Sequence, residues 1–96
     1  MSTGKDTLEQ KFKSALDKAD ARIDLLKAKA DAADAKTRIK LREEIDDLQS
    51  RRDALNDKLD DLRNSSGEAW RDLKAGMEAG WSSLSNAIER AASRFG

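Results

Sequence analysis

The sequence contains no cysteine, proline, histidine or tyrosine among its 96 residues, and only four aromatic side chains, Phe12, Trp70, Trp81 and Phe95. Without cysteine the chain cannot form a disulfide bond. Without histidine, cysteine or tyrosine it lacks the commonest catalytic bases, nucleophiles and transition-metal ligands, and its serines have no histidine to activate them. We therefore expect no enzyme activity, no metal site and no other cofactor.

The charge balance and the short apolar runs exclude further classes of protein. Charged residues make up 40% of the chain, and 19 bases balance 19 acids. A nucleic-acid-binding surface needs an excess of Lys and Arg, so we do not expect nucleic acid as a partner. No apolar run is long enough to predict a transmembrane helix, and residues 1–13 lack the apolar region of a secretory signal. The expected location is cytoplasmic.

Apolar residues recur at steps of three and four over the first two thirds of the chain. This spacing predicts one helix over residues 5–63 with a single buried stripe, in an elongated domain that spans residues 1–96 and has a disordered start at residues 1–4. Such a helix would be roughly 90 Å long and would need a partner helix to cover the stripe. The stripe consists of Leu8, Phe12, Leu16, Ala19, Ile23, Leu26, Ala30, Ala33, Thr37, Leu41, Ile45, Leu48, Leu55, Leu59 and Leu62.

Part of the stripe repeats every eleven residues instead of every seven. An eleven-residue period predicts a seam that is nearly straight or slightly right-handed, unlike that of a leucine zipper. The repeat is clearest where "WRDLKAGMEAG" is followed by "WSSLSNAIERA". The positions in register are Leu26, Thr37, Leu48, Leu59, Trp70, Trp81 and Ala92.

The segment "RNSSGEAW", residues 63–70, is the place where the helix is expected to end. Ser65 and Glu68 have the S-x-x-E spacing of a capping box, and Asn64 and Gly67 favour a helix end, so we predict a turn at residues 64–67. The alternative is a helix that continues through this segment, because the apolar phase does not slip there. Only Ser66 would then interrupt the seam.

A second helix is predicted over residues 66–95. Its stripe consists of Trp70, Leu73, Met77, Trp81, Leu84, Ile88 and Phe95, beside a flank of small residues, Ala69, Gly76, Gly80, Ser83, Ala87 and Ala91. A glycine inside a helix costs about 1 kcal/mol relative to alanine. We therefore interpret Gly76 and Gly80 as points of close helix contact, the alternative being an exposed flank without a role.

The tail "AWRDLKAGMEAGWSSLSNAIERAASRF" resembles the C-terminal segment of small bacterial coiled-coil proteins with an AW-x-x-L-K-x-G, AW-x-x-L pattern. The eleven-residue repeats of these proteins are similar to those of apolipoproteins. The resemblance covers about the last 27 residues, and Gly80 departs from it where Ala is commoner. It implies a helical coiled-coil fold and no particular activity.

The two helices lead to a long helical hairpin as the predicted fold, of the all-α class. A helix of thirty residues covers only half of a helix of sixty, so the hairpin would leave Leu8, Phe12, Leu16, Ile23 and Leu26 uncovered. We therefore expect a second copy of the chain to cover them, forming an antiparallel coiled coil or a helical bundle. The alternative is a second bend at residues 31–36, which would give three helices of about thirty residues and a monomeric bundle.

The charged blocks fit a solvated surface better than a binding site. Asp57 and Asp61 stand four apart, but no Gly-bearing calcium loop accompanies them. The four bases within residues 36–42 are followed at once by the four acids within residues 43–47. We expect such blocks to set the register of helix pairing. The expected function is that of a structural or protein-interaction coiled coil. The alternative is a lipid-surface binder that uses the apolar face of residues 66–95.

Overall fold

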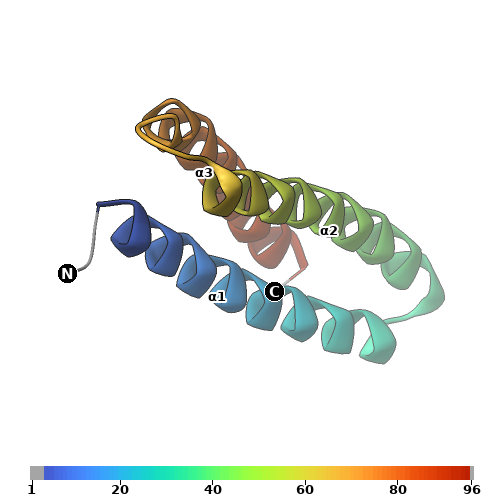
Figure 1. The fold of residues 1–96 in the computed structure, drawn as a ribbon. Coiled ribbons are helices and arrows are strands. Elements are labelled where there is room, and N and C mark those ends of the chain that lie inside the picture. Colours follow the sequence, from blue (N-terminus) through green and yellow to red (C-terminus); the bar gives the residue numbers. More distant parts are fainter. Residues whose placement is uncertain (1–3, 96) are drawn as a thin grey trace.

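The computed structural model describes residues 4–95, without the side chain of Phe95, and consists of three helices (Figure 1). They are α1 (Gly4–Ala32), α2 (Ala35–Asn64) and α3 (Trp70–Phe95), which run up, down and up in a bundle of 51 × 20 × 18 Å. No strand occurs in residues 4–95, so the predicted all-α class is confirmed. Of the start expected to be disordered, residues 1–3 lie outside the described residues, and Gly4 begins α1.

The helix expected over residues 5–63 is instead two antiparallel helices, separated at Ala33 and Asp34. The two-helix hairpin was therefore not the right arrangement, and the bend at residues 31–36 is present. The physical reason is burial: folding α1 back on α2 covers the apolar stripes of both helices, whereas a straight rod would leave half of its stripe in water.

Asp34 begins α2 as its N-cap. Its backbone is extended, with φ −65° and ψ 167°, and its carboxylate accepts a hydrogen bond of 2.7 Å from the Thr37 N–H. The preceding helix ends with a bond of 3.2 Å from the Ala33 N–H to the Ala30 carbonyl. A short polar side chain thus satisfies one of the free N–H groups of the first turn, and the chain reverses without Gly or Pro.

The connection between α2 and α3 lies at residues 65–69, and the predicted capping box is not formed there. Ser65 ends α2 instead: its N–H and its hydroxyl both donate to the Leu62 carbonyl, at 3.2 and 2.7 Å. Glu68 is exposed and pairs with Arg71 at 3.6 Å, and α3 begins only at Trp70. Serine can cap either end of a helix, so the S-x-x-E spacing could not tell the two apart.

The left-handed conformation in this connection belongs to Gly67, with φ 62°, and not to Asn64, which remains helical. The end of α2 is also held by α1. Lys5 Nζ donates to the carbonyls of Ser65 and Arg63, at 2.6 and 3.1 Å. A positive charge at a helix C-terminus is favourable because the free carbonyls there carry partial negative charge.

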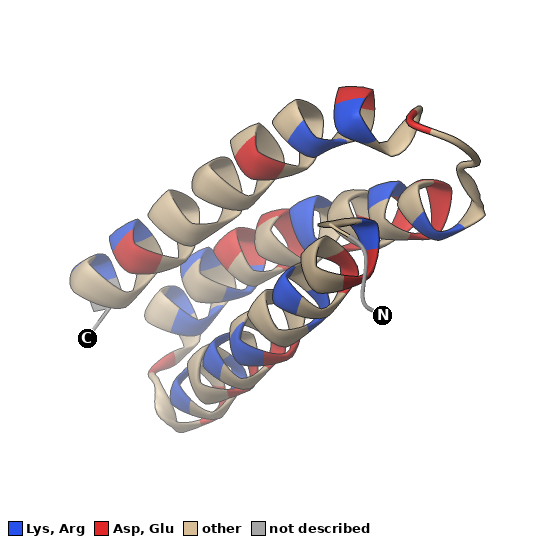
Figure 2. Ribbon diagram, turned by 60° about the vertical axis from the view of Figure 1, so that its left-hand side comes forward, with Lys and Arg blue, Asp and Glu red and all other residues tan. Residues whose placement is uncertain are grey.

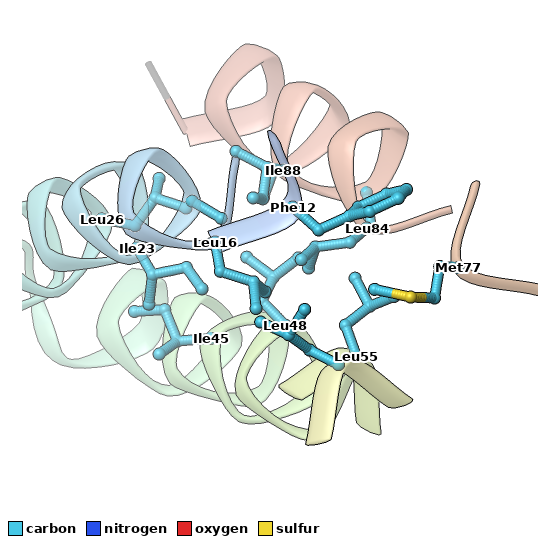
Figure 3. Close-up of a cluster of buried hydrophobic side chains, with 14 of the residues drawn as sticks. Phe12, Leu16, Ile23, Leu26, Ile45, Leu48, Leu55, Met77, Leu84 and Ile88 are labelled. Atoms are coloured by element: carbon cyan, nitrogen blue, oxygen red, sulfur yellow. The ribbon is translucent and has the colours of Figure 1, made fainter. Parts of the chain in front are cut away.

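The three helices enclose one continuous apolar core (Figure 3). The seven largest side chains with less than 2% exposure are Leu41, Leu48, Leu59, Leu62, Met77, Leu84 and Ile88. No polar or charged residue among those described is buried. Each fully buried Leu or Ile is worth about 1.5–3 kcal/mol relative to exposure, so this core is the main source of stability.

The stripe of α1 is covered within the same chain. Leu8, Phe12, Leu16, Ile23 and Leu26 are 2–7% exposed and belong to the same cluster as the buried residues of α2 and α3. α1 packs along α2, and α3 packs chiefly against α2 and less extensively against α1. The geometric reason for expecting a second chain over these five residues therefore does not hold.

Candidate functional site

The predicted packing residues of α3 fall into two groups. Met77, Leu84 and Ile88 are at most 1% exposed and point into the core, where Figure 3 shows them beside Phe12 of α1 and Leu55 of α2. Trp70, Leu73 and Trp81 are half-buried and pack against the edge of the core. The side chain of Phe95 lies outside the described residues. The apolar face of α3 is thus mostly occupied by its own chain.

The two glycines of α3 differ in their surroundings. A Cβ placed on Gly80 would lie 2.7 Å from Leu55 Cδ2, so the backbone of α3 approaches α2 closely at this point. Gly76 is exposed, and a Cβ there would have only Lys58 Nζ within reach, at 4.0 Å. The expected close contact is therefore present at Gly80 and absent at Gly76.

The first tryptophan lies over the start of α1. A Cβ on Gly4 would come within 3.0 Å of Trp70 Cη2, so the indole ring covers the backbone there. Arg71 lies over the same ring, 5.6 Å from its centroid. The Trp70 side chain therefore packs over the first residue of α1 and is only partly available to a partner.

Ion pairs between helices supply a second set of contacts, whose individual partners the sequence did not predict. Arg52 of α2 binds Asp20 of α1 through two hydrogen bonds, Nε to Oδ1 at 2.8 Å and Nη2 to Oδ2 at 3.0 Å. These bonds raise the pKa of Arg52 above its ordinary value, mainly because the charged guanidinium is stabilised by the Asp20 carboxylate. Arg94 of α3 binds Glu44 of α2 at 2.6 Å. The charged blocks indicated that charges would face one another between helices, but the spacing along one helix did not indicate which residues would pair.

A hollow on the surface lies between the start of α2 and the end of α3. It has a volume of about 940 Å³ and is lined by Lys36, Thr37, Lys40, Glu43, Glu44, Asp47, Ser93 and Arg94. Bases and acids line it together, and one of them, Arg94, is already paired with Glu44. No group of three or more potential metal ligands occurs among the described residues, Asp57 and Asp61 included.

Charges are spread unevenly along the helices. Figure 2 shows acids and bases along α1 and α2, whereas the middle of α3 has none. Residues 79–88, "AGWSSLSNAI", form this uncharged stretch. None of the helices described is long and apolar enough to cross a lipid bilayer.

Two large apolar side chains are exposed among the described residues. Leu25 of α1 is 65% exposed and Ile39 of α2 is 62% exposed. Both lie within ten residues of the connection between α1 and α2. The apolar periodicity did not single them out, because neither falls on the core stripe.

Comparison of the chain with protein-family models, with curated protein sequences and with solved structures found no match.

Proposed function

We propose that this chain is a structural or protein-interaction module that acts without catalysis, through contacts between the outer faces of its helices and other helical surfaces, including copies of itself. The observation that carries the proposal is the exposure of Leu25 and Ile39 on a bundle whose other large aliphatic side chains lie in or against the core. Covering an exposed apolar side chain of this size with a partner removes apolar surface from water and so lowers the free energy of the complex.

The bundle suits this role because its core is complete. The apolar core holds the helices, while the ion pair between Arg52 and Asp20 fixes the position of α2 on α1. A partner can therefore bind a preformed surface and does not have to order the chain first, which lowers the entropic cost of binding.

Affinity capture from the native cell with matched variants tests the proposal. The variant Leu25→Lys/Ile39→Lys removes both exposed apolar side chains. The control Ser50→Lys/Ala54→Lys adds the same two charges at other exposed positions of α2. We expect partner proteins to be retained by the unmodified chain and by the control, and lost with the first variant. Recovery of the same proteins with all three chains would reject the proposal.

A second candidate is binding to a lipid surface through α3. The half-buried Trp70, Leu73 and Trp81 and the uncharged residues 79–88 support it. Because Met77, Leu84 and Ile88 are buried, α3 would have to leave the bundle to present its whole apolar face. Tryptophan emission that is unchanged by vesicles of anionic lipid would reject this candidate.

A further inference from the structure

The outer face of α1 carries a stripe of uncharged side chains opposite the core. Ala21, Leu25, Ala28 and Ala32 follow one another at steps of four, three and four residues, and all four are exposed. Steps of four and three are those of the positions along which two helices pair in a coiled coil. Leu25, with 65% of its surface exposed, is the largest of them. We call these four residues the outer seam.

Charged residues flank the outer seam with one sign on each side. On one flank are two acids seven residues apart, Asp17 and Asp24. On the other flank are two bases seven residues apart, Arg22 and Lys29. In a parallel pair of helices, the residue directly before Leu25 in one copy faces the residue five positions later in the other copy, and the same holds seven residues earlier. That rule pairs Asp17 with Arg22 of the second copy and Asp24 with Lys29 of the second copy.

We propose that two copies of this chain associate in parallel about a two-fold axis, with the outer seams of their α1 helices in contact. The inference deepens the proposed function, on which it rests, by naming the partner and the surface. Both pairings occur twice because of the symmetry, which gives four favourable ion pairs. An antiparallel pair would instead bring acids against acids and bases against bases, and like charges in contact are unfavourable.

The bundle leaves this face free. Figure 1 shows how α2 and α3 lie relative to α1. The core stripe of α1 faces these two helices, so the exposed outer seam lies on the opposite side of α1. Asp17, Arg22 and Lys29 form no ion pair within the described residues, and Asp24 has only an exposed contact with Lys27 at 3.9 Å. Such an exposed pair contributes little, so Asp24 is available to a second copy.

The composition of the seam sets the strength of the dimer. Three alanines and one leucine bury little area, and Lys18, which occupies the next seam position towards the N-terminus, meets its own copy. A charged residue at one seam position lowers stability and selects the two-stranded, in-register pairing. The dimer is therefore weak and reversible.

Sedimentation equilibrium on the purified full chain, from about 10 µM to about 1 mM, tests the association. The mass is expected to rise with concentration from 10.6 kDa towards twice that value. Leu25→Lys should raise the dissociation constant about tenfold or more, because it replaces the largest apolar contact with a like-charged pair. Ile39→Lys, a matched change at the other exposed aliphatic, should leave the dissociation constant unchanged. A monomer at every concentration, or equal weakening by both variants, would overturn the proposal.

Cysteine cross-linking tests the orientation, since the natural chain has no cysteine. Ser14 continues the seam seven residues before Ala21 and is exposed, so Ser14→Cys is expected to give a disulfide-linked dimer under mild oxidation. Ser50→Cys, exposed on α2, is the control and should cross-link no faster than random collision allows. Equal rates for the two variants would reject the parallel arrangement.

The two proposals fail in different experiments. If the purified chain stays monomeric while capture of other proteins still depends on Leu25 and Ile39, the dimer is wrong and the interaction function stands. If the chain dimerises through Leu25 and captures no other protein, the dimer stands and the partner is limited to a second copy.

Discussion

At the scale of single residues, Gly76 and Gly80 offer a controlled pair, because they lie one turn apart in α3 and differ mainly in what faces them. Gly80→Ala would place a methyl group 2.7 Å from Leu55 Cδ2, so the end of the Leu55 side chain, which is 4% exposed and lies in the core, would have to shift. Gly76→Ala would point into open space beside Lys58. Either substitution is expected to stabilise the helix by about 1 kcal/mol through its propensity. The difference between the free energies of unfolding of the two variants therefore reports packing at Gly80.

We expect Gly76→Ala to raise the free energy of unfolding by up to about 1 kcal/mol, and Gly80→Ala to be less stable than Gly76→Ala by about 1–3 kcal/mol, the usual range for an overpacked core. Urea unfolding followed by circular dichroism measures both. Equal stability of the two variants would show that Leu55 accommodates the added methyl group without a packing cost.

The residues of the core could be predicted well from the sequence, and those of the surface could not. Leu8, Phe12, Leu16 and Ala19 lie at steps of four, four and three residues because a helix presents one face every 3.6 residues, and burial follows that period. Steps of three and four residues lead from Ile23 to Leu26 and Ala30 and miss Leu25, so the period itself leaves Leu25 off the core stripe. What an exposed residue such as Leu25 contacts could not be predicted, because the core period carries no information about the outer face of a helix.

At the scale of elements, the connection between α1 and α2 was the feature hardest to predict. The apolar phase continues through Ala30, Ala33, Thr37 and Leu41 without a slip, so the period that located the core also suggested an unbroken helix. The local sign of the break is Asp34, whose side chain caps α2. Aspartate is a strong N-cap but is also common on helix surfaces, so its sequence context alone did not separate the two roles.

Asp34 gives the connection a dependence on pH. The Thr37 N–H donates to its carboxylate, which lowers the pKa of Asp34 below the ordinary value of 3.8. A carboxyl group whose pKa is lower in the folded state stabilises the fold above the unfolded pKa. This contribution is lost as the pH falls through the folded value.

We expect Asp34→Ala to lower the melting temperature at neutral pH, because the first turn of α2 loses its cap. Asp34→Asn keeps a cap but cannot ionise, so the stability difference between it and the unmodified chain should narrow as the pH falls below 3.8. Thermal unfolding across this range measures both effects. A difference that stays constant with pH would show that the carboxylate does not bind the Thr37 N–H.

At the scale of the whole molecule, chain reversal at Asp34 decides the shape. The bundle is 51 Å long, whereas a continuous helix over residues 5–63 would be roughly 90 Å long. The reversal also brings Asp20 and Arg52 together, with Arg52 Nε 2.8 Å from Asp20 Oδ1. In a continuous helix a separation of 32 positions in sequence would hold these side chains roughly 48 Å apart.

This difference makes Asp20 and Arg52 a direct test of the fold. We expect the double variant Asp20→Cys/Arg52→Cys to be joined within one chain by a short bifunctional thiol reagent at micromolar protein concentration, since the two positions are neighbours in the bundle. Mass spectrometry of the cross-linked monomer measures the product. Each single variant is the control and can only link two chains. If the double variant also links only two chains, then α1 does not fold back on α2. The face of α1 opposite the outer seam would then not be buried within the same chain.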